Sequence, residues 1–185
     1  MGNARLKDIR KVSRRSVRSE RRLFLADGPK AVEGALGVPG CVVEVFTTEA
    51  GRALVGPDVD VTLVDDRALA SLSDSVTPAG VVALCRFVDR PLEHLLATGP
   101  RLVAICAEVR DPGNAGTVVR TADAAGADAV VLAGQSVDLY NPKTLRAAVG
   151  SAFHLPVAVE PDPADAVRAA RAAGLTVLAD RKSVV

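Results

Sequence analysis

Hydrophobic positions in the first half of the chain fall into short runs with helical patterns between them. Residues 4–19 predict a helix, although their apolar positions are sparse, a second helix ends near Gly37, and a helical stretch follows Asp66. Three β-rich runs bounded by turn residues are expected to be strands: 42–47, 59–64 and 80–87. This order predicts a small α/β domain over residues 1–88. Residues 89–100 are expected to form a linker or a short helix.

The second half repeats a strand–helix unit. Four apolar runs are expected to be strands: 102–107, 129–133, 155–159 and 175–179. Helical spacing covers the segments between them: 114–125, about 143–150, and 164–173. Strands that are apolar throughout are typical of a parallel sheet covered on both faces. The pattern predicts a doubly wound, parallel α/β domain over residues 101–185, whose ligand lies at the carboxyl ends of its strands.

Composition narrows the class of protein. Hydrophobic residues make up 49% and charged residues 24%, which is ordinary for a soluble globular chain and unlike a disordered one. No apolar run is long enough to span a membrane, and no apolar segment follows the arginine-rich N-terminus as in a secretory signal. The cysteines are too few and too scattered for disulfides or a zinc site. We expect buried free thiols in a cytoplasmic protein: Cys41, Cys85 and Cys106.

The net charge of +1 hides an asymmetry. The first 30 residues hold ten basic and three acidic residues, so they carry +7 and the other 155 residues carry −6. A basic segment on an acidic body indicates a polyanionic partner, although a solvated helix face or a frayed tail has the same charge pattern. Charge alone does not choose RNA over DNA or a membrane surface. The candidates for contacts with such a polyanion are Arg10, Lys11, Arg14, Arg15, Arg18, Arg21 and Arg22.

Two loops at the expected carboxyl ends of the strands carry polar residues. After the run 102–107, Asp111 to Gly113 predict a turn and Asn114 a helix N-cap. A turn and a cap explain this loop without any function. Arg120 follows inside an otherwise small and apolar helix, near the carboxyl ends of the strands, where it is either solvated or directed at an anion.

The second loop, residues 134–141, leads into a helix that starts with Pro142. Lys143 and Arg146 stand one turn apart and can both reach a phosphate, although a solvated pair is equally common. Neither GxGxxG nor GxxxxGK[ST] accompanies the strands, so the nucleotide-binding folds that these motifs mark have no support. Together the two loops favour a site for a polar anionic ligand.

Two segments stand out for their order: DPGNAGTVVRTADAAGAD at 111–128 and VDLYNPKTLRAAVGSAF at 137–153. They resemble the first and second motifs of the SpoU-type (TrmH) RNA 2′-O-ribose methyltransferases. Three shorter segments are similar to the substrate-binding domain of that family: 24–28, 32–36 and 77–83. Asp27 stands where a glutamate is usual. The resemblance covers essentially the whole chain.

The resemblance implies an enzyme that transfers a methyl group from S-adenosylmethionine to a ribose 2′-hydroxyl of RNA, with rRNA preferred and tRNA as the other substrate. It also implies a trefoil-knotted α/β catalytic fold, a homodimer and no metal ion. The catalytic candidates are Asn114 and Arg120. Lys143 and Arg146 join the basic N-terminal residues as candidates for RNA contacts. The residues assigned to the cofactor are Ala133, Gly134, Asn141 and Ser151.

A guanidinium stays protonated near neutral pH. We therefore interpret Arg120 as holding the phosphate beside the target ribose and stabilising the developing alkoxide, while Asn114 orients Arg120 or the ribose. The third motif of the family, a Gly-Asn-Glu-Gly loop and a Ser-Leu-Asn helix, has no counterpart in the sequence. Its absence predicts a truncated or frame-shifted member that binds S-adenosylmethionine weakly or not at all. The alternative function is a non-catalytic RNA-binding protein derived from such an enzyme.

Overall fold

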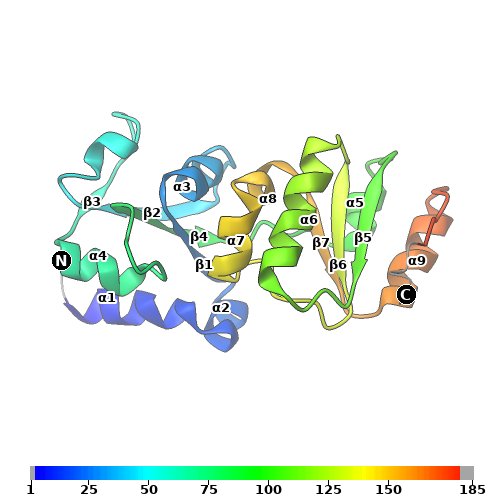
Figure 1. Ribbon diagram of the computed structural model, residues 1–185, viewed down its shortest axis with the longest axis horizontal. Coiled ribbons are helices and arrows are strands. Elements are labelled where there is room, and N and C mark those ends of the chain that lie inside the picture. Colours follow the sequence, from blue (N-terminus) through cyan, green and yellow to red (C-terminus); the bar gives the residue numbers. More distant parts are fainter. Residues whose placement is uncertain (1–2, 180–185) are drawn as a thin grey trace, which may run out of the picture.

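The computed structural model describes residues 3–179, and among them the first sheet has four strands in the order β1-β4-β2-β3 (Figure 1). The strands are β1 (Leu23–Asp27), β2 (Val42–Thr47), β3 (Thr62–Leu63) and β4 (Val81–Arg86). β4 pairs antiparallel with β1 and β2, and β2 pairs parallel with β3. The helices of this half are α1 (Asn3–Arg10), α2 (Arg15–Arg21), α3 (Pro29–Leu36) and α4 (Asp66–Leu72), with the short turns η1 (Lys11–Ser13) and η2 (Arg52–Leu54).

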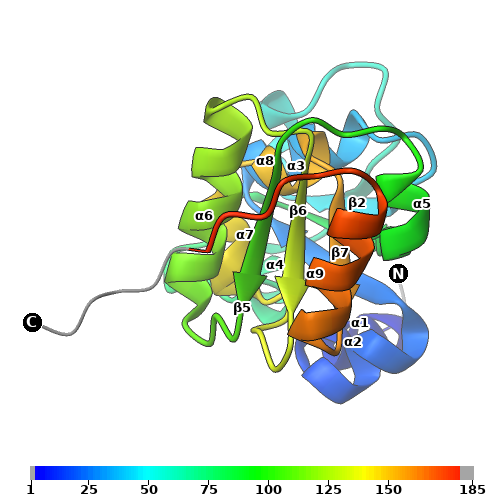
Figure 2. The same cartoon turned by 90° about the vertical axis from the view of Figure 1, so that its right-hand side faces the viewer.

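The second sheet is parallel, with three strands in the order β5-β6-β7 within the described residues. These strands are β5 (Val103–Ala107), β6 (Ala129–Ala133) and β7 (Val157–Glu160). The helices around it are α5 (Leu92–Leu96), α6 (Pro112–Ala124), α7 (Pro142–Ala148), α8 (Ser151–His154) and α9 (Pro163–Ala172). Figure 2 shows α6, α7 and α8 on one side of the sheet and α5 and α9 on the other.

The central strand β6 explains this layering. Val130 and Leu132 pack into the core beneath α6 and α7, while Ala129, Val131 and Ala133 pack against α5 and α9. Both faces of β6 are therefore buried, as its unbroken apolar sequence predicts. The predicted parallel α/β architecture is confirmed, and α5, which falls inside residues 89–100, packs on this sheet.

The N-terminal helix predicted over residues 4–19 is wrong as one element. α1 ends at Arg10, a 3-10 turn follows, and Arg14 takes an extended conformation with φ −83° and ψ 130° before α2 begins. The break buries Val12 and leaves the carbonyls of Val12 and Ser13 free to accept hydrogen bonds from the Arg18 side chain. A continuous helix would use those carbonyls in its own backbone ladder.

Two strand predictions also need correction, and one strand was missed. The segment β1, which pairs with β4 over five residues, was not predicted as a strand. The run 59–64 contributes only the two residues of β3, and Val59 and Val61 are partly buried against the core outside the ladder. Residues 175–179 form no ladder; they pass beside the outer edge of β5 (Figure 2), and Leu178 is 90% exposed.

The two halves share one hydrophobic core. It joins Phe24 of β1 to Tyr140, which precedes α7, with ring centroids 4.6 Å apart. Phe87 stacks on Tyr140 at 3.8 Å, and Phe153 lies 6.0 Å from Phe24. These rings, which we call the aromatic seam (Phe24, Phe87, Tyr140 and Phe153), include four of the five aromatic residues of the chain. Aromatic packing therefore concentrates where the halves meet.

The predicted state of the cysteines is confirmed, since all three are free and buried. Between residues 3 and 179 no helix has the length and apolar character needed to cross a bilayer. Within the same range no cluster of His, Cys, Asp and Glu side chains is arranged to hold a metal ion.

Candidate functional site

The two predicted loops meet at the carboxyl ends of β5 and β6. Glu108, which follows β5, has a φ of +58°, and its carboxylate accepts a hydrogen bond from the Gln135 amide at 3.1 Å. This bond, followed by the hydrogen bond from Arg110, lowers the pKa of the Glu108 carboxyl. Gly134 has a φ of +70°, and a Cβ there would lie 2.2 Å from Glu108 Oε1, so only glycine fits. Sequence reasoning missed Glu108, whose one signal is its place directly after a buried strand.

Helix α6 carries both catalytic candidates. It starts at Pro112, two residues earlier than predicted from Asn114, and Asp111 is its N-cap because that carboxylate accepts from the Asn114 amide at 2.8 Å. The N-cap prediction for Asn114 is therefore wrong, and its side chain remains exposed.

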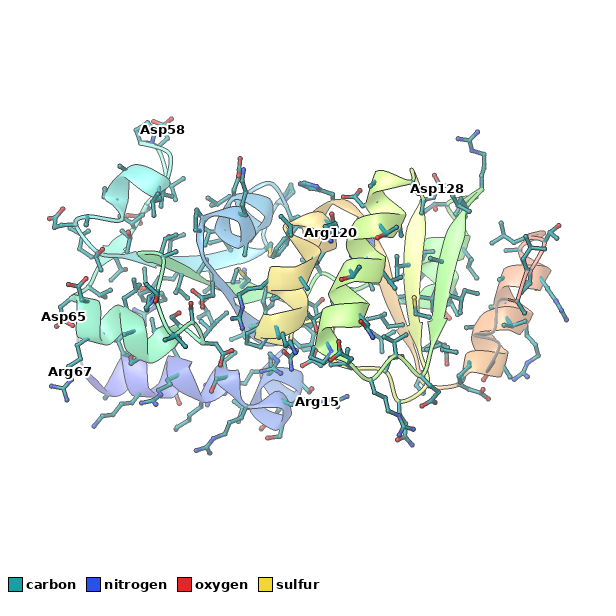
Figure 3. All side chains as sticks on the ribbon, in the orientation of Figure 1. Arg15, Asp58, Asp65, Arg67, Arg120 and Asp128 are labelled. Carbon is teal, nitrogen blue, oxygen red and sulfur yellow. The ribbon has the colours of Figure 1, made fainter. Side chains whose placement is uncertain are left out.

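Arg120 is also exposed, and it forms no ion pair with any described residue (Figure 3). It lies about 12 Å along the axis from the start of α6, so the expectation that it stands near the carboxyl ends of the strands is wrong. The six-residue separation between Asn114 and Arg120 places them about 9 Å and about 120° apart on the helix. The chain therefore presents two separate polar positions on α6 and does not bring them into contact.

Helix α7 packs tightly against α6. A Cβ on Gly116 would lie 2.4 Å from the Thr144 carbonyl and 2.6 Å from Ala147 Cβ, so glycine permits this approach. Lys143 Nζ lies 3.9 Å from Asp111 Oδ2 at the start of α6, and Arg146 Nη2 lies 3.3 Å from Asp74 Oδ2. Both basic side chains remain substantially exposed. The close packing of α6 on α7 therefore brings the two motifs together.

The four residues assigned to the cofactor lie on β6 and around α7 and α8. Ala133 is fully buried on the α5 and α9 side of β6, and Gly134 lies at the end of the same strand. The Asn141 side chain accepts from the Lys143 amide at 2.9 Å and caps α7. Ser151 is buried at the start of α8, which packs on α3 and α6. The assignment of these four residues to S-adenosylmethionine therefore stays a prediction.

Arg18 is the clearest correction among the residues predicted to bind RNA. Its guanidinium donates to Asp138 Oδ2 from Nε at 2.9 Å and from Nη2 at 2.7 Å. Nη1 donates to the carbonyls of Val12 at 3.0 Å and Ser13 at 2.7 Å. The Arg18 side chain is only 4% exposed, and that of Asp138 is 11% exposed. An arginine so buried and so fully hydrogen-bonded is not available to an RNA phosphate.

The other predicted basic residues lie on the surface in two groups. Arg21 and Lys11 both pair with Asp8, and their hydrogen bonds, that of Arg21 first, lower the pKa of Asp8 to about 2. Arg22 pairs with Asp89 at 3.1 Å and covers the Phe87 ring at 4.6 Å. Three of these predicted residues are exposed and make no ion pair within residues 3–179, and we call them the solvent-side arginines: Arg10, Arg14 and Arg15.

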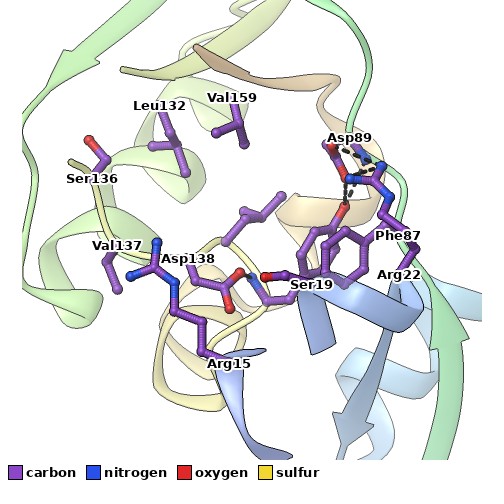
Figure 4. Close-up of a pocket in the computed structure, with 12 residues that line it drawn as sticks. Arg15, Ser19, Arg22, Phe87, Asp89, Leu132, Ser136, Val137, Asp138 and Val159 are labelled. Carbon is purple, nitrogen blue, oxygen red and sulfur yellow. Dashed lines mark hydrogen bonds and ion pairs between the residues drawn. The ribbon is translucent and has the colours of Figure 1, made fainter. Parts of the chain in front are cut away.

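A cavity of about 190 Å³ opens where α2 meets the carboxyl ends of β6 and β7 (Figure 4). Its lining comes from α2, from the chain after β4, from the two strand ends and from the loop before α7: Arg15, Ser19, Arg22, Phe87, Asp89, Leu132, Ser136, Val137, Asp138, Leu139, Tyr140 and Val159. Tyr140 and Arg22 both bind Asp89 on one wall, as the dashed lines in Figure 4 mark. N-terminal helices and second-half loops therefore share one surface.

Comparison with known proteins follows this division of the chain. Residues 101–183 match the model of the SpoU rRNA Methylase family, and residues 3–83 match the model of the MRM3-like substrate binding domain. A crystal structure of an rRNA methyltransferase from Sinorhizobium meliloti superposes on this chain with a TM-score of 0.82 and 32% sequence identity. The matched region covers 98% of this chain and 71% of the Sinorhizobium meliloti chain. The chain belongs to the SpoU family.

Two further relatives of this SpoU chain are informative. The 23S rRNA (guanosine(2553)-2′-O)-methyltransferase RlmP of Bacillus subtilis is 38% identical over 157 residues, which are 84% of this chain and 61% of RlmP. The SpoU methyltransferase AviRb of Streptomyces viridochromogenes, solved in complex with AdoMet, is 27% identical to this chain, with a TM-score of 0.78. The matched region covers 94% of this chain and 70% of the AviRb chain. The chain thus spans about three fifths of its curated relative RlmP.

Proposed function

We propose that this chain acts as an S-adenosylmethionine-dependent RNA 2′-O-ribose methyltransferase on rRNA. The observation that carries the proposal is its membership of the SpoU family, with relatives named as rRNA 2′-O-methyltransferases. Support comes from the match of residues 3–83 to a substrate-binding domain and from the solvent-side arginines, which offer positive charge to a phosphate backbone.

The described residues act on the RNA side of this reaction. S-adenosylmethionine supplies the methyl group when it is bound. The ribose 2′-hydroxyl is a poor nucleophile and must lose its proton as it attacks. A guanidinium is a lasting positive charge near neutral pH, so we assign Arg120 to holding the adjacent phosphate and stabilising the developing alkoxide. Asn114, on the same helix, is assigned to orienting the ribose.

Several finer features of the proposal stay predictions. These are the target nucleotide in rRNA, the trefoil knot, the homodimer, the absence of a metal ion and a cytoplasmic location. Lys143 and Arg146 are proposed as RNA contacts, because both are exposed on α7, Lys143 beside the first turn of α6 and Arg146 beside Asp74.

The test measures methyl transfer to purified bacterial rRNA by mass spectrometry of the released nucleosides. We expect 2′-O-methylated nucleosides, and a rate that falls a few hundred-fold in Arg120→Ala, corresponding to about 3–4 kcal/mol of lost transition-state stabilisation. Arg120→Lys is expected to be nearly as damaging, because lysine lacks the planar fork of guanidinium. Arg171→Lys, on the exposed side of α9, is the matched control and should retain the parental rate.

Calorimetric titration with S-adenosylmethionine completes the test. Its affinity should be the same in the Arg120 variants as in the parent, because Arg120 is assigned to the RNA. A cofactor affinity that collapses in Arg120→Ala would move Arg120 into the cofactor site. A chain that binds rRNA and forms no 2′-O-methylated nucleoside would contradict the proposal in favour of RNA binding without catalysis.

A further inference from the structure

Arg18 connects α2 to a loop 120 residues away in the chain. Its partner Asp138 lies in the segment between β6 and α7, which carries the start of the second SpoU motif. All three guanidinium nitrogens of Arg18 donate hydrogen bonds, two of them to one carboxylate oxygen. Charge-assisted hydrogen bonds of this kind fix geometry more strongly than neutral ones. The contact therefore fixes both the position of the Arg18 guanidinium and its orientation toward Asp138.

Asp138 in turn organises the entry into α7. Its Oδ1 accepts from the Tyr140 amide at 2.9 Å, and its backbone carbonyl accepts from the Asn141 amide at 3.0 Å. Asn141 then caps α7 by accepting from the Lys143 amide. An unbroken series of hydrogen bonds thus runs from the Arg18 side chain to the first turn of the helix that carries Lys143.

The same loop is held by a second group of contacts. The Tyr140 hydroxyl accepts from the amides of Val88 and Asp89 and donates to Asp89 Oδ1, all at 2.7 Å. These contacts anchor one residue of the loop to the chain after β4. Arg18 alone reaches the loop from the N-terminal helices through a buried ion pair among the described residues.

We propose that Arg18 is a positioning residue. It fixes the loop at residues 136–141, and with it the start of α7, at a set distance from the solvent-side arginines on α1 and α2. RNA held on those helices is then presented to α7 and α6 in one orientation. The catalytic part of this inference rests on the proposed function, whereas the structural part does not.

The first experiment compares hydrogen–deuterium exchange in Arg18→Gln and in Arg14→Gln, a matched control that removes the same charge from an exposed position. We expect the amides of residues 136–141 to exchange at least tenfold faster in Arg18→Gln and at the parental rate in Arg14→Gln. The amides of β6 should keep their protection in both variants, because the strand ladder is not touched. Asp138→Asn removes the carboxylate that accepts from Arg18 and keeps the side-chain volume, so it should also speed exchange in residues 136–141. It replaces Arg18→Gln in the experiment if that variant does not fold.

The second experiment is steady-state methyl transfer with rRNA. Arg18→Gln is expected to lower kcat about tenfold with little change in KM for RNA, since the phosphate-binding surface is intact. Arg14→Gln is expected to raise KM and leave kcat near the parental value.

Three outcomes would overturn the inference. Parental exchange in the loop in both the Arg18 and the Asp138 variants would mean that the pair does not hold the loop. An equal loss of protection in β6 and the loop would make Arg18 a general stability residue, and a rise in KM without a fall in kcat would make it a phosphate ligand. If the parent shows no methyl transfer, the proposed function fails while the exchange experiment still decides the structural claim.

Discussion

The basic helices face two environments. Arg10, Arg14 and Arg15 are exposed and form no ion pair with any residue between 3 and 179, and Arg15 also lines the cavity between α2 and the second half. On the side facing the second half, Arg18 is buried against Asp138, and Arg22 is held by Asp89 over the Phe87 ring. The same residue type, within one short stretch of chain, therefore supplies an RNA-facing surface and an internal connection.

The difference depends on what lies opposite each guanidinium. A buried carboxylate converts an arginine into a structural element with fixed geometry, because neither charge can return to water without leaving the other unpaired. An arginine facing solvent keeps its charge free for a polyanion, and its interactions are screened by salt. The comparison teaches that the charge of +7 over the first 30 residues overstates the RNA-binding charge.

The largest expected effect is on stability. Arg18→Ala leaves Asp138 buried without its cation, and we expect it to lower the free energy of unfolding by about 3–5 kcal/mol. Arg22→Ala removes a largely exposed ion pair and a cation–π contact, for which we expect about 1 kcal/mol. Urea denaturation measures both. An equal fall in the free energy of unfolding in the two variants would contradict the difference between the buried Arg18 contact and the exposed Arg22 contact.

A smaller effect is expected at alkaline pH. Burial first, and then the charge of Asp89, raise the pKa of Tyr140 above its ordinary value near 10. Because the folded state binds this proton more tightly than the unfolded state, the contribution of Tyr140 is fully present below about pH 10 and is lost as the pH rises further.

Tyr140 is the only tyrosine, and the chain has no tryptophan, so its near-ultraviolet absorbance reports the aromatic seam directly. We expect tyrosinate absorbance to appear only together with the loss of helical circular dichroism. Tyrosinate that forms near pH 10 in a chain with native circular dichroism would mean that the seam is open to water.

Periodicity predicted most of the second half. The strands of this sheet lie in apolar runs separated by turn residues, so both their positions and their parallel arrangement could be read from the sequence. It did not predict the break between α1 and α2, because that break is stabilised by Arg18, whose role depends on tertiary contacts. Residues 175–179 have a strand pattern, yet a ladder requires a pairing partner as well as propensity.

The candidate site was predicted in part. The motif loops were located from their residues, and the structure packs their helices together at Gly116. The bond from Gln135 to Glu108 and the pair between Arg18 and Asp138 join residues far apart in the chain, and such pairings leave no mark in local spacing or charge counts. The distance of Arg120 from the strand ends likewise follows from the direction of α6.

The salt dependence of rRNA binding tests the division of the basic helices most directly. Affinity is measured between about 50 and 200 mM salt for the parent, for Arg18→Gln and for a variant with all three solvent-side arginines changed to Gln. We expect the triple variant to flatten the slope of log affinity against log salt by about two to three units, close to one for each lost phosphate contact. Arg18→Gln should keep the parental slope. A slope that flattens by about one unit in Arg18→Gln would show that Arg18 binds phosphate and would contradict the account.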